Sequence, residues 1–243
     1  MMVWGDQRLS SPINVKVSDE VLAEFSASDY DDNGHHPVEQ MLLKWDNAYP
    51  NVQFFNIPTQ VTSNHHQTLD IHNFNDAEMG IYLSRDWFPD ISSSALAITQ
   101  FYGVKRSWNN LGYLELIHAD IILNYRYHNF SLNKNDFNSY YLPSVLLHEI
   151  GHFLGLSHQR DITQNSIMQP YMSSFDSPTQ LSNIDIQTLT NNYNKTPNIN
   201  PTPVVLSRTT SKSKEGEVIR GVIELHKDGT CRHYVDGKLV HSH

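Results

Sequence analysis

Alternating and helically spaced hydrophobic positions divide the first part of the chain into strands and a helix. Residues 13–17 alternate between apolar and polar side chains, which is typical of a half-buried strand. Further runs rich in apolar residues predict strands at residues 52–55, 79–84, 95–102 and 114–127. Four apolar residues recur at helical spacing and predict an amphipathic helix over residues 37–48: Val38, Met41, Leu42 and Trp45.

Two more helices are expected further along the chain. Pro143 suits the first turn of a helix that is apolar nearly all round, as expected of a buried helix. A final helix is predicted over residues 182–193, where Ser182 and Asp185 have the spacing of a capping box. The chain therefore combines strands and helices in an α+β arrangement.

The last fifty residues have a different pattern. Residues 195–203 contain three prolines among Asn and Thr, and residues 207–214 are rich in Ser, Thr and Lys, which predicts an extended linker over residues 195–216. Beyond it, Asp228-Gly229 and Asp236-Gly237 separate three apolar runs, as in a β-meander over residues 217–243. Such a unit is too small to be stable alone, so we expect it to pack on the rest of the chain, a partner or another copy.

Charge and composition exclude several classes of function. The formal net charge is -9 and no basic cluster is present, which argues against a nucleic-acid partner. No apolar run approaches the roughly 20 residues that span a membrane. The first twenty residues lack the apolar stretch of a signal peptide, so either the numbering begins at a mature or recombinant start or the protein leaves the cell by another route. We expect a secreted or extracellular mature form.

The segment from His148 to His158 carries the strongest chemical signal, since it has the pattern H-E-x-x-H-x-x-G-x-x-H. Residues four apart share one face of a helix, so His148 and His152 can hold a single ion. Gly155 can end the helix in a left-handed conformation and return His158 as a third ligand. Three imidazoles with an open fourth position predict a catalytic zinc, and Glu149 is placed to act as the general base on its activated water.

This motif, with the segments that follow it, resembles the matrixin branch of the metzincin zinc proteases. Met168 follows at the distance of the metzincin Met-turn, and Met-x-Pro with a nearby Tyr looks matrixin-like. Residues 181–187 are similar to the segment that opens the last matrixin helix, and residues 94–99 and 119–124 resemble two matrixin strands. The single cysteine, Cys231, excludes an internal disulfide and favours a bacterial over a vertebrate type.

The resemblance implies a fold, a cofactor and site residues. We expect residues 1–194 to form a catalytic domain with a twisted, mixed five-stranded sheet, an active-site helix, a Met-turn and a C-terminal helix. It implies a zinc-dependent endopeptidase that cleaves proteins or peptides. It also implies a pocket wall of Ile167, Pro170 and Tyr171 beside Met168. Extended substrate would pair with an edge strand that contains four residues in a row: Leu96, Ala97, Ile98 and Thr99.

Some positions depart from the matrixin pattern. Gln159 follows the third histidine where matrixins typically have Ser, and Ile184 replaces one of two acids in the last helix. Asp185 remains, and two compatible roles are open for it: capping its own helix and supporting the Met-turn. Pro170 stands two residues after Met168, so a tyrosine zinc ligand of the astacin kind is not expected.

Three further features of the sequence are candidate sites. Asp29, Asp31 and Asn33 match the first half of a calcium loop, but Gln40 stands where the closing Glu belongs, and an acidic surface loop is the alternative. Five scattered histidines could form a second zinc site, although their spacing favours surface positions: His65, His66, His72, His118 and His128. Cys231 could be a latency thiolate or simply a free thiol in the meander.

Two alternatives to a matrixin-like protease remain open. The chain could be a zinc-containing module that binds a surface or partner through its C-terminal segment without proteolysis. It could also belong to a different metzincin branch. The intact Glu149 argues against a purely structural zinc site, which would not need a general base.

Overall fold

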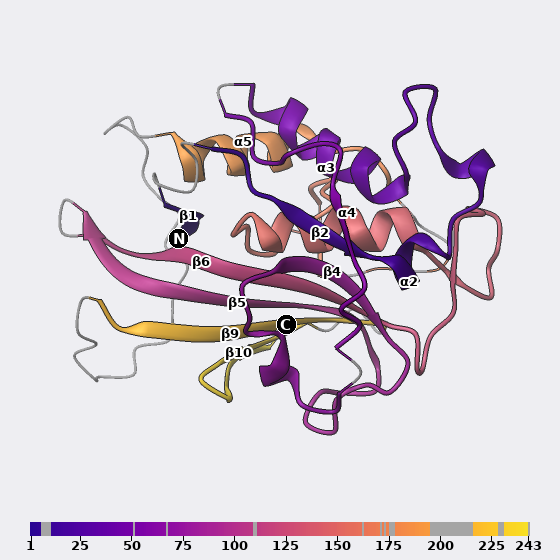
Figure 1. Ribbon diagram of the computed structural model, residues 1–243. Coiled ribbons are helices and arrows are strands. Elements are labelled where there is room, and N and C mark those ends of the chain that lie inside the picture. Colours follow the sequence, from indigo (N-terminus) through magenta and orange to yellow (C-terminus); the bar gives the residue numbers. More distant parts are fainter. Residues whose placement is uncertain are drawn as a thin grey trace.

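A computed structural model of the 243-residue chain describes residues 1–5, 11–50, 52–66, 68–108, 111–161, 163–170, 172, 174, 178–194, 216–227 and 231–242. Its centre is a twisted sheet with three longer helices on one side (Figure 1). These helices are α3 (Pro37–Ala48), α4 (Leu142–Phe153) and α5 (Asn183–Tyr193). Shorter elements are α2 (Asp19–Leu22), the 3-10 turns Ala27–Asp29 and Ile71–Phe74, and the paired strands β7 (Phe130–Ser131) and β8 (Tyr140–Tyr141).

Within the predicted catalytic domain, five strands lie side by side in the sheet. They are β2 (Val15–Ser18), β3 (Gln60–Thr62), β4 (Met79–Ser84), β5 (Ala95–Trp108) and β6 (Leu111–Asn124). Their order is β3-β2-β4-β6-β5, and every pair is parallel except β5 with β6. The expected mixed five-stranded α+β arrangement is therefore confirmed.

The sheet is larger than expected because four more strands join it. A short β1 (Met2–Trp4) runs parallel to β6. On the other side, β9 (Val218–His226), β10 (Cys231–Val235) and β11 (Lys238–Ser242) form the predicted meander and continue the sheet beyond β5. The meander thus packs on the catalytic domain, one of the three expected placements. The linker at residues 195–215 and the Asp228-Gly229 turn lie outside the described residues.

One predicted strand is wrong. Residues 52–55 form no ladder; Phe55 makes only an isolated bridge with Ile13. Phe54 and Phe55 are both fully buried in the main core, so their apolar character reflects burial and not strand pairing.

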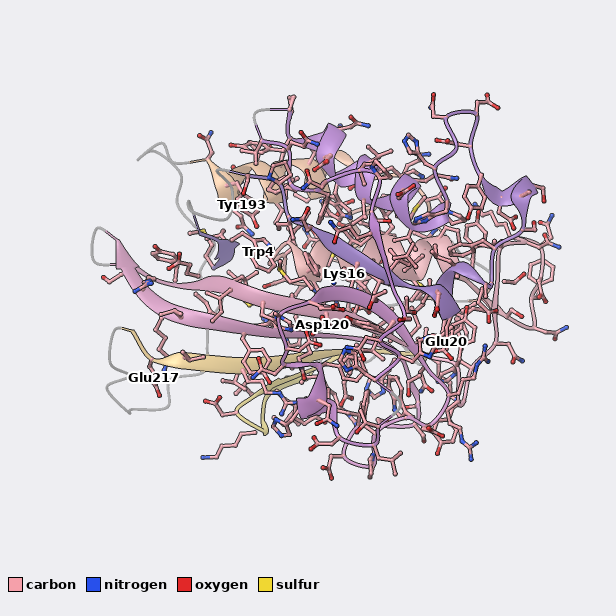
Figure 2. The ribbon with its side chains drawn as sticks, viewed as in Figure 1. Trp4, Lys16, Glu20, Asp120, Tyr193 and Glu217 are labelled. Atoms are coloured by element: carbon pink, nitrogen blue, oxygen red, sulfur yellow. The ribbon has the colours of Figure 1, made fainter. Side chains whose placement is uncertain are left out.

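The helices and the N-terminal strand enclose the core around α4, whose twelve residues are all buried. The Trp45 indole of α3 donates to the Leu147 carbonyl of α4 at 2.9 Å. At the C-terminal end of α4, the Trp4 indole donates to Phe153 O at 2.9 Å, and the Tyr193 hydroxyl donates to Leu154 O at 2.8 Å. Trp4 and Tyr193 lie together above the sheet in Figure 2. These bonds satisfy buried carbonyls and hold the end of α4 where the chain turns toward His158.

Candidate metal and catalytic site

The active-site helix ends in the way the motif predicts. Gly155 has φ +85°, and its N–H donates to His152 O at 2.8 Å while Leu156 N–H donates to Gly151 O at 2.9 Å. These bonds close the helix in a left-handed turn. A Cβ at Gly155 would also lie 2.3 Å from Met2 O, so both conformation and space require glycine here. The turn brings His158 back toward α4.

Three imidazole nitrogens converge on one point. The Nε2 atoms of His148, His152 and His158 lie 2.9, 3.0 and 3.1 Å from one another. Tetrahedral zinc with bonds of roughly 2.0–2.1 Å places its nitrogens roughly 3.3 Å apart, so the triad is close to the arrangement that zinc requires. In the described part of the chain, this is the one group of three or more His, Cys, Asp or Glu residues with metal-ligand spacing.

The other ring nitrogens decide which tautomers are present. His148 Nδ1 lies 2.7 Å from Ile167 O, and His152 Nδ1 lies 2.8 Å from Leu156 O. Because a carbonyl only accepts, both rings carry their proton on Nδ1 and present a bare lone pair at Nε2. Lone pairs directed at a common point repel one another unless a cation lies between them. The residues present therefore fit a zinc ion.

Burial favours the neutral form of the two ligands on α4. It lowers the pKa of His148 to about 4, against the opposing effects of its bond to Ile167 O and the charge of Asp185. Burial also lowers the pKa of His152 well below its usual value, and the neighbouring His148 acts in the same direction. Neutral imidazoles are the form that binds a metal.

Glu149 is fully buried beside the triad. The Thr99 hydroxyl donates to its Oε2 at 2.5 Å, whereas Oε1 has no hydrogen-bond partner. Burial raises the pKa of Glu149 to about 8, and the Thr99 hydrogen bond opposes this shift. A buried carboxylate oxygen without a partner is rare, and its presence here indicates that Glu149 is directed at a group that the protein itself does not supply.

Met168 lies beneath the metal ligands. It is buried, and a Cβ at Gly151 of α4 would lie 2.3 Å from its sulfur. The backbone N–H of Gln159 donates to the Met168 carbonyl at 2.8 Å. Gln159, which differs from the matrixin pattern, therefore contacts the Met-turn through its backbone. The Met-turn thus packs against α4 because residue 151 has no side chain.

Asp185 performs both of the roles left open for it. Its Oδ2 accepts from Ser182 N and Ser182 Oγ, both at 2.8 Å, which completes the capping box of α5. The same carboxylate accepts from Ile167 N at 3.1 Å and from Ser166 Oγ, both in the Met-turn. One buried acid therefore fixes the turn whose Ile167 carbonyl orients His148.

Two of the three residues expected to form a pocket wall lie in the described part of the chain. Ile167 is buried, Pro170 is half-buried, and Tyr171 lies outside the described residues.

The expected edge strand is not an edge. Antiparallel pairing joins β5 to β9 from Ala95 opposite His226 to Val104 opposite Val218. The four residues expected to bind substrate, Leu96, Ala97, Ile98 and Thr99, are all fully buried. The hydrophobic pattern of residues 217–243 predicts strands, but it does not say which strand of the sheet they pair with.

His233 was also missed by sequence reasoning. The Nε2 atom of this β10 residue lies 3.3 Å from Nδ1 of His158. The Nδ1 atom of the third ligand therefore faces an imidazole, whereas the Nδ1 atoms of His148 and His152 face backbone carbonyls. The rings of His158 and His233 lie edge to face with centroids 5.3 Å apart. No motif marks His233; its position becomes apparent only once β9 and β10 are placed beside β5.

The calcium residues have other partners. Asp31 Oδ1 accepts from the backbone N–H groups of Asn33 and His35, both at 2.9 Å, and Asp29 Oδ2 accepts from Ser26 N at 2.7 Å. Gln40 Nε2 donates to Asp29 O at 3.0 Å and closes the loop where a calcium-binding Glu would stand. These contacts order the loop by hydrogen bonds, and calcium binding by it stays a prediction.

Each of the five scattered histidines has a partner of its own. His65 pairs with Asp19, His118 with Asp120, His72 with Arg220, and His128 with the Ser93 carbonyl. His66 pairs with Asp76. Cys231 begins β10, and its side chain lies outside what the structure describes. None of the helices in the described ranges is long and apolar enough to cross a membrane.

Comparison with known proteins supports this geometry. The sequence matches the matrixin family over residues 26–194, which is more than half of the 243 residues and contains the three histidines, Glu149, Met168 and Asp185. A search of curated proteins finds no match. With this match, the convergent histidine triad and the supporting Met-turn, the chain belongs to the matrixin family of zinc-dependent metallopeptidases.

Proposed function

We propose that this metallopeptidase is an endopeptidase that cleaves within extended protein or peptide segments, with Glu149 as its general base. The observation that carries the proposal is the buried Glu149 carboxylate, oriented by Thr99 on one oxygen and without a partner on the other, next to a convergent histidine triad. Zinc held at the triad would supply a Lewis acid and acidify the attacking water.

The environment of Glu149 suits proton transfer. A pKa raised by burial makes a carboxylate a stronger base, and general bases work best when their pKa lies near the working pH. A dication at the triad favours the ionised form and brings the pKa back down from about 8. Thr99 holds the side chain in one rotamer so that its free oxygen can take a proton and pass it to the leaving amine.

An extended substrate is the class that suits this surface. The strand β5 carries Thr99, which touches Glu149, so the side of β5 that pairs with β9 is the one nearest the reacting groups, and a peptide would reach it in place of β9. A peptide that adds a strand there gains main-chain hydrogen bonds along its length, which places one peptide bond at the metal without needing a free chain end. A binding module without catalysis would have no use for the oriented Glu149 carboxylate.

The test uses purified full-length protein with casein, gelatin and a library of quenched peptides. Glu149→Gln should retain about one zinc per chain and lose essentially all cleavage, since it keeps the side-chain shape and removes the base. Thr188→Ser, on the half-buried face of α5, is a control that leaves cleavage unchanged. Cleavage by Glu149→Gln at the rate of the unaltered protein would refute the mechanism. Release of single terminal residues alone would refute the endopeptidase assignment.

A further inference from the structure

The C-terminal meander covers the metal site. Register places Thr99 of β5 opposite Ile223 of β9, and Ile223 opposite His233 of β10. At one end of this row Thr99 contacts Glu149, and at the other His233 contacts His158. His148 and Glu149 are 0% exposed, and His158 is 7% exposed. The row therefore crosses the site from its general base to its third ligand.

We propose that β9–β11 is an intramolecular ligand of the peptide-binding edge of β5, which excludes substrate until the meander is released. This inference rests on the proposed endopeptidase function, because it concerns access to the same site. In Figure 1 the yellow β9 lies alongside β5 for most of its length. Its main-chain pairing uses the β5 groups that an added substrate strand would need, so the two cannot bind together.

The contact between β5 and β9 is more polar than a permanent core. Gln100 of β5 and Glu224 of β9 are fully buried there, and Gln100 Nε2 and Glu224 Oε1 have no hydrogen-bond partner. Leaving such atoms buried without partners costs stability, and release of the meander would return them to water. These unsatisfied groups favour a contact that can open.

A cavity of about 340 Å³ lies under the meander. Its lining includes Phe101 of β5, Leu114 of β6, Ile219 and Ile223 of β9, and His233 of β10. Pockets of this size are typical of ligand sites. The meander therefore spans the peptide-binding surface without filling it, as expected of a cover that can be removed.

Covalent attachment gives the meander an advantage over a free substrate. The meander belongs to the same chain as β5, and a segment attached in this way has an effective concentration on the order of millimolar. A peptide substrate at micromolar concentration would compete poorly with it. Basal cleavage by the full chain should thus be slow, and weakening the β5–β9 pairing should accelerate it.

Gly221 offers a way to weaken that pairing without touching the site. It lies opposite Phe101, and a Cβ at Gly221 would be 2.0 Å from the Phe101 ring. Gly221→Val should therefore displace β9 and raise kcat/KM on a quenched peptide by about tenfold or more. Val61→Ala is the control, because Val61 is exposed on β3, the strand at the opposite edge of the sheet.

A disulfide across the same strands tests the opposite direction. Lys105 N–H donates to Glu217 O, so the adjacent pair, Val104 opposite Val218, is a non-hydrogen-bonded pair. The Cβ atoms of such a pair are close enough for a disulfide between cysteines. A Val104→Cys, Val218→Cys double variant, with Cys231→Ser to remove the native thiol, should lose its activity when oxidised. Reduction with dithiothreitol should restore the basal rate.

The outcomes separate this inference from the proposed function. Faster cleavage by Gly221→Val and a reversible loss of cleavage in the oxidised double variant support the inference. Adding Glu149→Gln to Gly221→Val should abolish the increase in cleavage rate. Equal rates in the unaltered, Gly221→Val, oxidised and reduced forms would overturn it and leave the endopeptidase intact. If amide exchange shows that β9 is released in Gly221→Val, yet the zinc-loaded protein cleaves nothing, the proposed function fails and this inference falls with it.

Discussion

The hydroxyl of Thr99 on β5 donates a hydrogen bond of 2.5 Å to the carboxylate of Glu149 on α4. The two residues are fifty positions apart, and both are fully buried. This bond joins the strand that borders the site to the residue that we assign as general base. It also stabilises the ionised form of Glu149, because a carboxylate accepts a hydrogen bond more strongly than its protonated form does.

Thr99→Val should shift the acid limb of the pH profile of kcat/KM. The change keeps the shape of the side chain and removes the donor, so the pKa of Glu149 should rise and cleavage should need a higher pH. A hydrogen bond to a charged group is worth about 1.5–3 kcal/mol, which corresponds to a shift of about one pH unit or more. Thr99→Ser retains the hydroxyl and should leave the limb in place; equal shifts in both variants would contradict this role of the hydroxyl.

Asp185 joins the cap of α5 to the Met-turn, and its variants should separate the two roles. Asp185→Ala loses both sets of contacts and should reduce the free energy of unfolding by about 2–4 kcal/mol. Ser182→Ala removes only the cap and should cost about 1 kcal/mol, with zinc affinity unchanged. Ser166→Ala removes a Met-turn contact and should weaken zinc binding.

Urea unfolding and zinc titration of the three Asp185-network variants provide the measurements. If Ser182→Ala weakens zinc binding as much as Ser166→Ala, the cap and the Met-turn act as one unit and the separation fails.

Local signals in the sequence predicted the elements that depend on neighbouring residues. The bounds of α3 and β4 agree with the hydrophobic pattern, since each element buries one regular set of side chains. The capping box at Ser182 and the turn at Gly155 are equally local. The triad follows from helical spacing, because positions four apart and a glycine turn determine where three imidazoles meet.

Features that depend on contacts distant along the chain were not predictable. The pattern of 95–102 indicated a strand but not its neighbours, so the pairing with β9 was missed. His233 lies 75 positions from His158, and strand alternation alone does not say what faces it. Phe54 and Phe55 had the composition of a strand, yet tertiary burial and not ladder pairing explains them.

Gly151→Ala should destabilise the protein despite the higher helix propensity of alanine. The new methyl group would meet the Met168 sulfur at 2.3 Å and the Trp45 ring at 2.9 Å, which forces the Met-turn away from α4. We expect a loss of about 1–3 kcal/mol and weaker zinc binding, measured by thermal unfolding and metal titration. Gly112→Ala, in open space, should change neither quantity. A Gly151→Ala protein that binds zinc with unchanged affinity would show that Met168 does not support the ligands.

The pKa of Glu149 makes a specific prediction for the metal-free protein. Because burial raises this pKa to about 8, from a usual value of 4.5, the folded chain holds a proton that the unfolded chain releases between these pH values. Stability contributed by protonated Glu149 is therefore present below about pH 4.5 and is lost as pH rises through about 8. Glu149→Gln never ionises, so its stability relative to the unaltered protein should grow by up to about 5 kcal/mol across that range.

Comparing the two proteins at each pH cancels the titration of the histidines, which both contain. Urea unfolding with a chelator present, from pH 5 to pH 9, measures the difference. Adding zinc provides the control, because a dication beside Glu149 favours its ionised form and should flatten the pH dependence of the difference. A difference that stays constant with pH in the metal-free proteins would show that Glu149 is ionised throughout, and that water reaches it despite the meander.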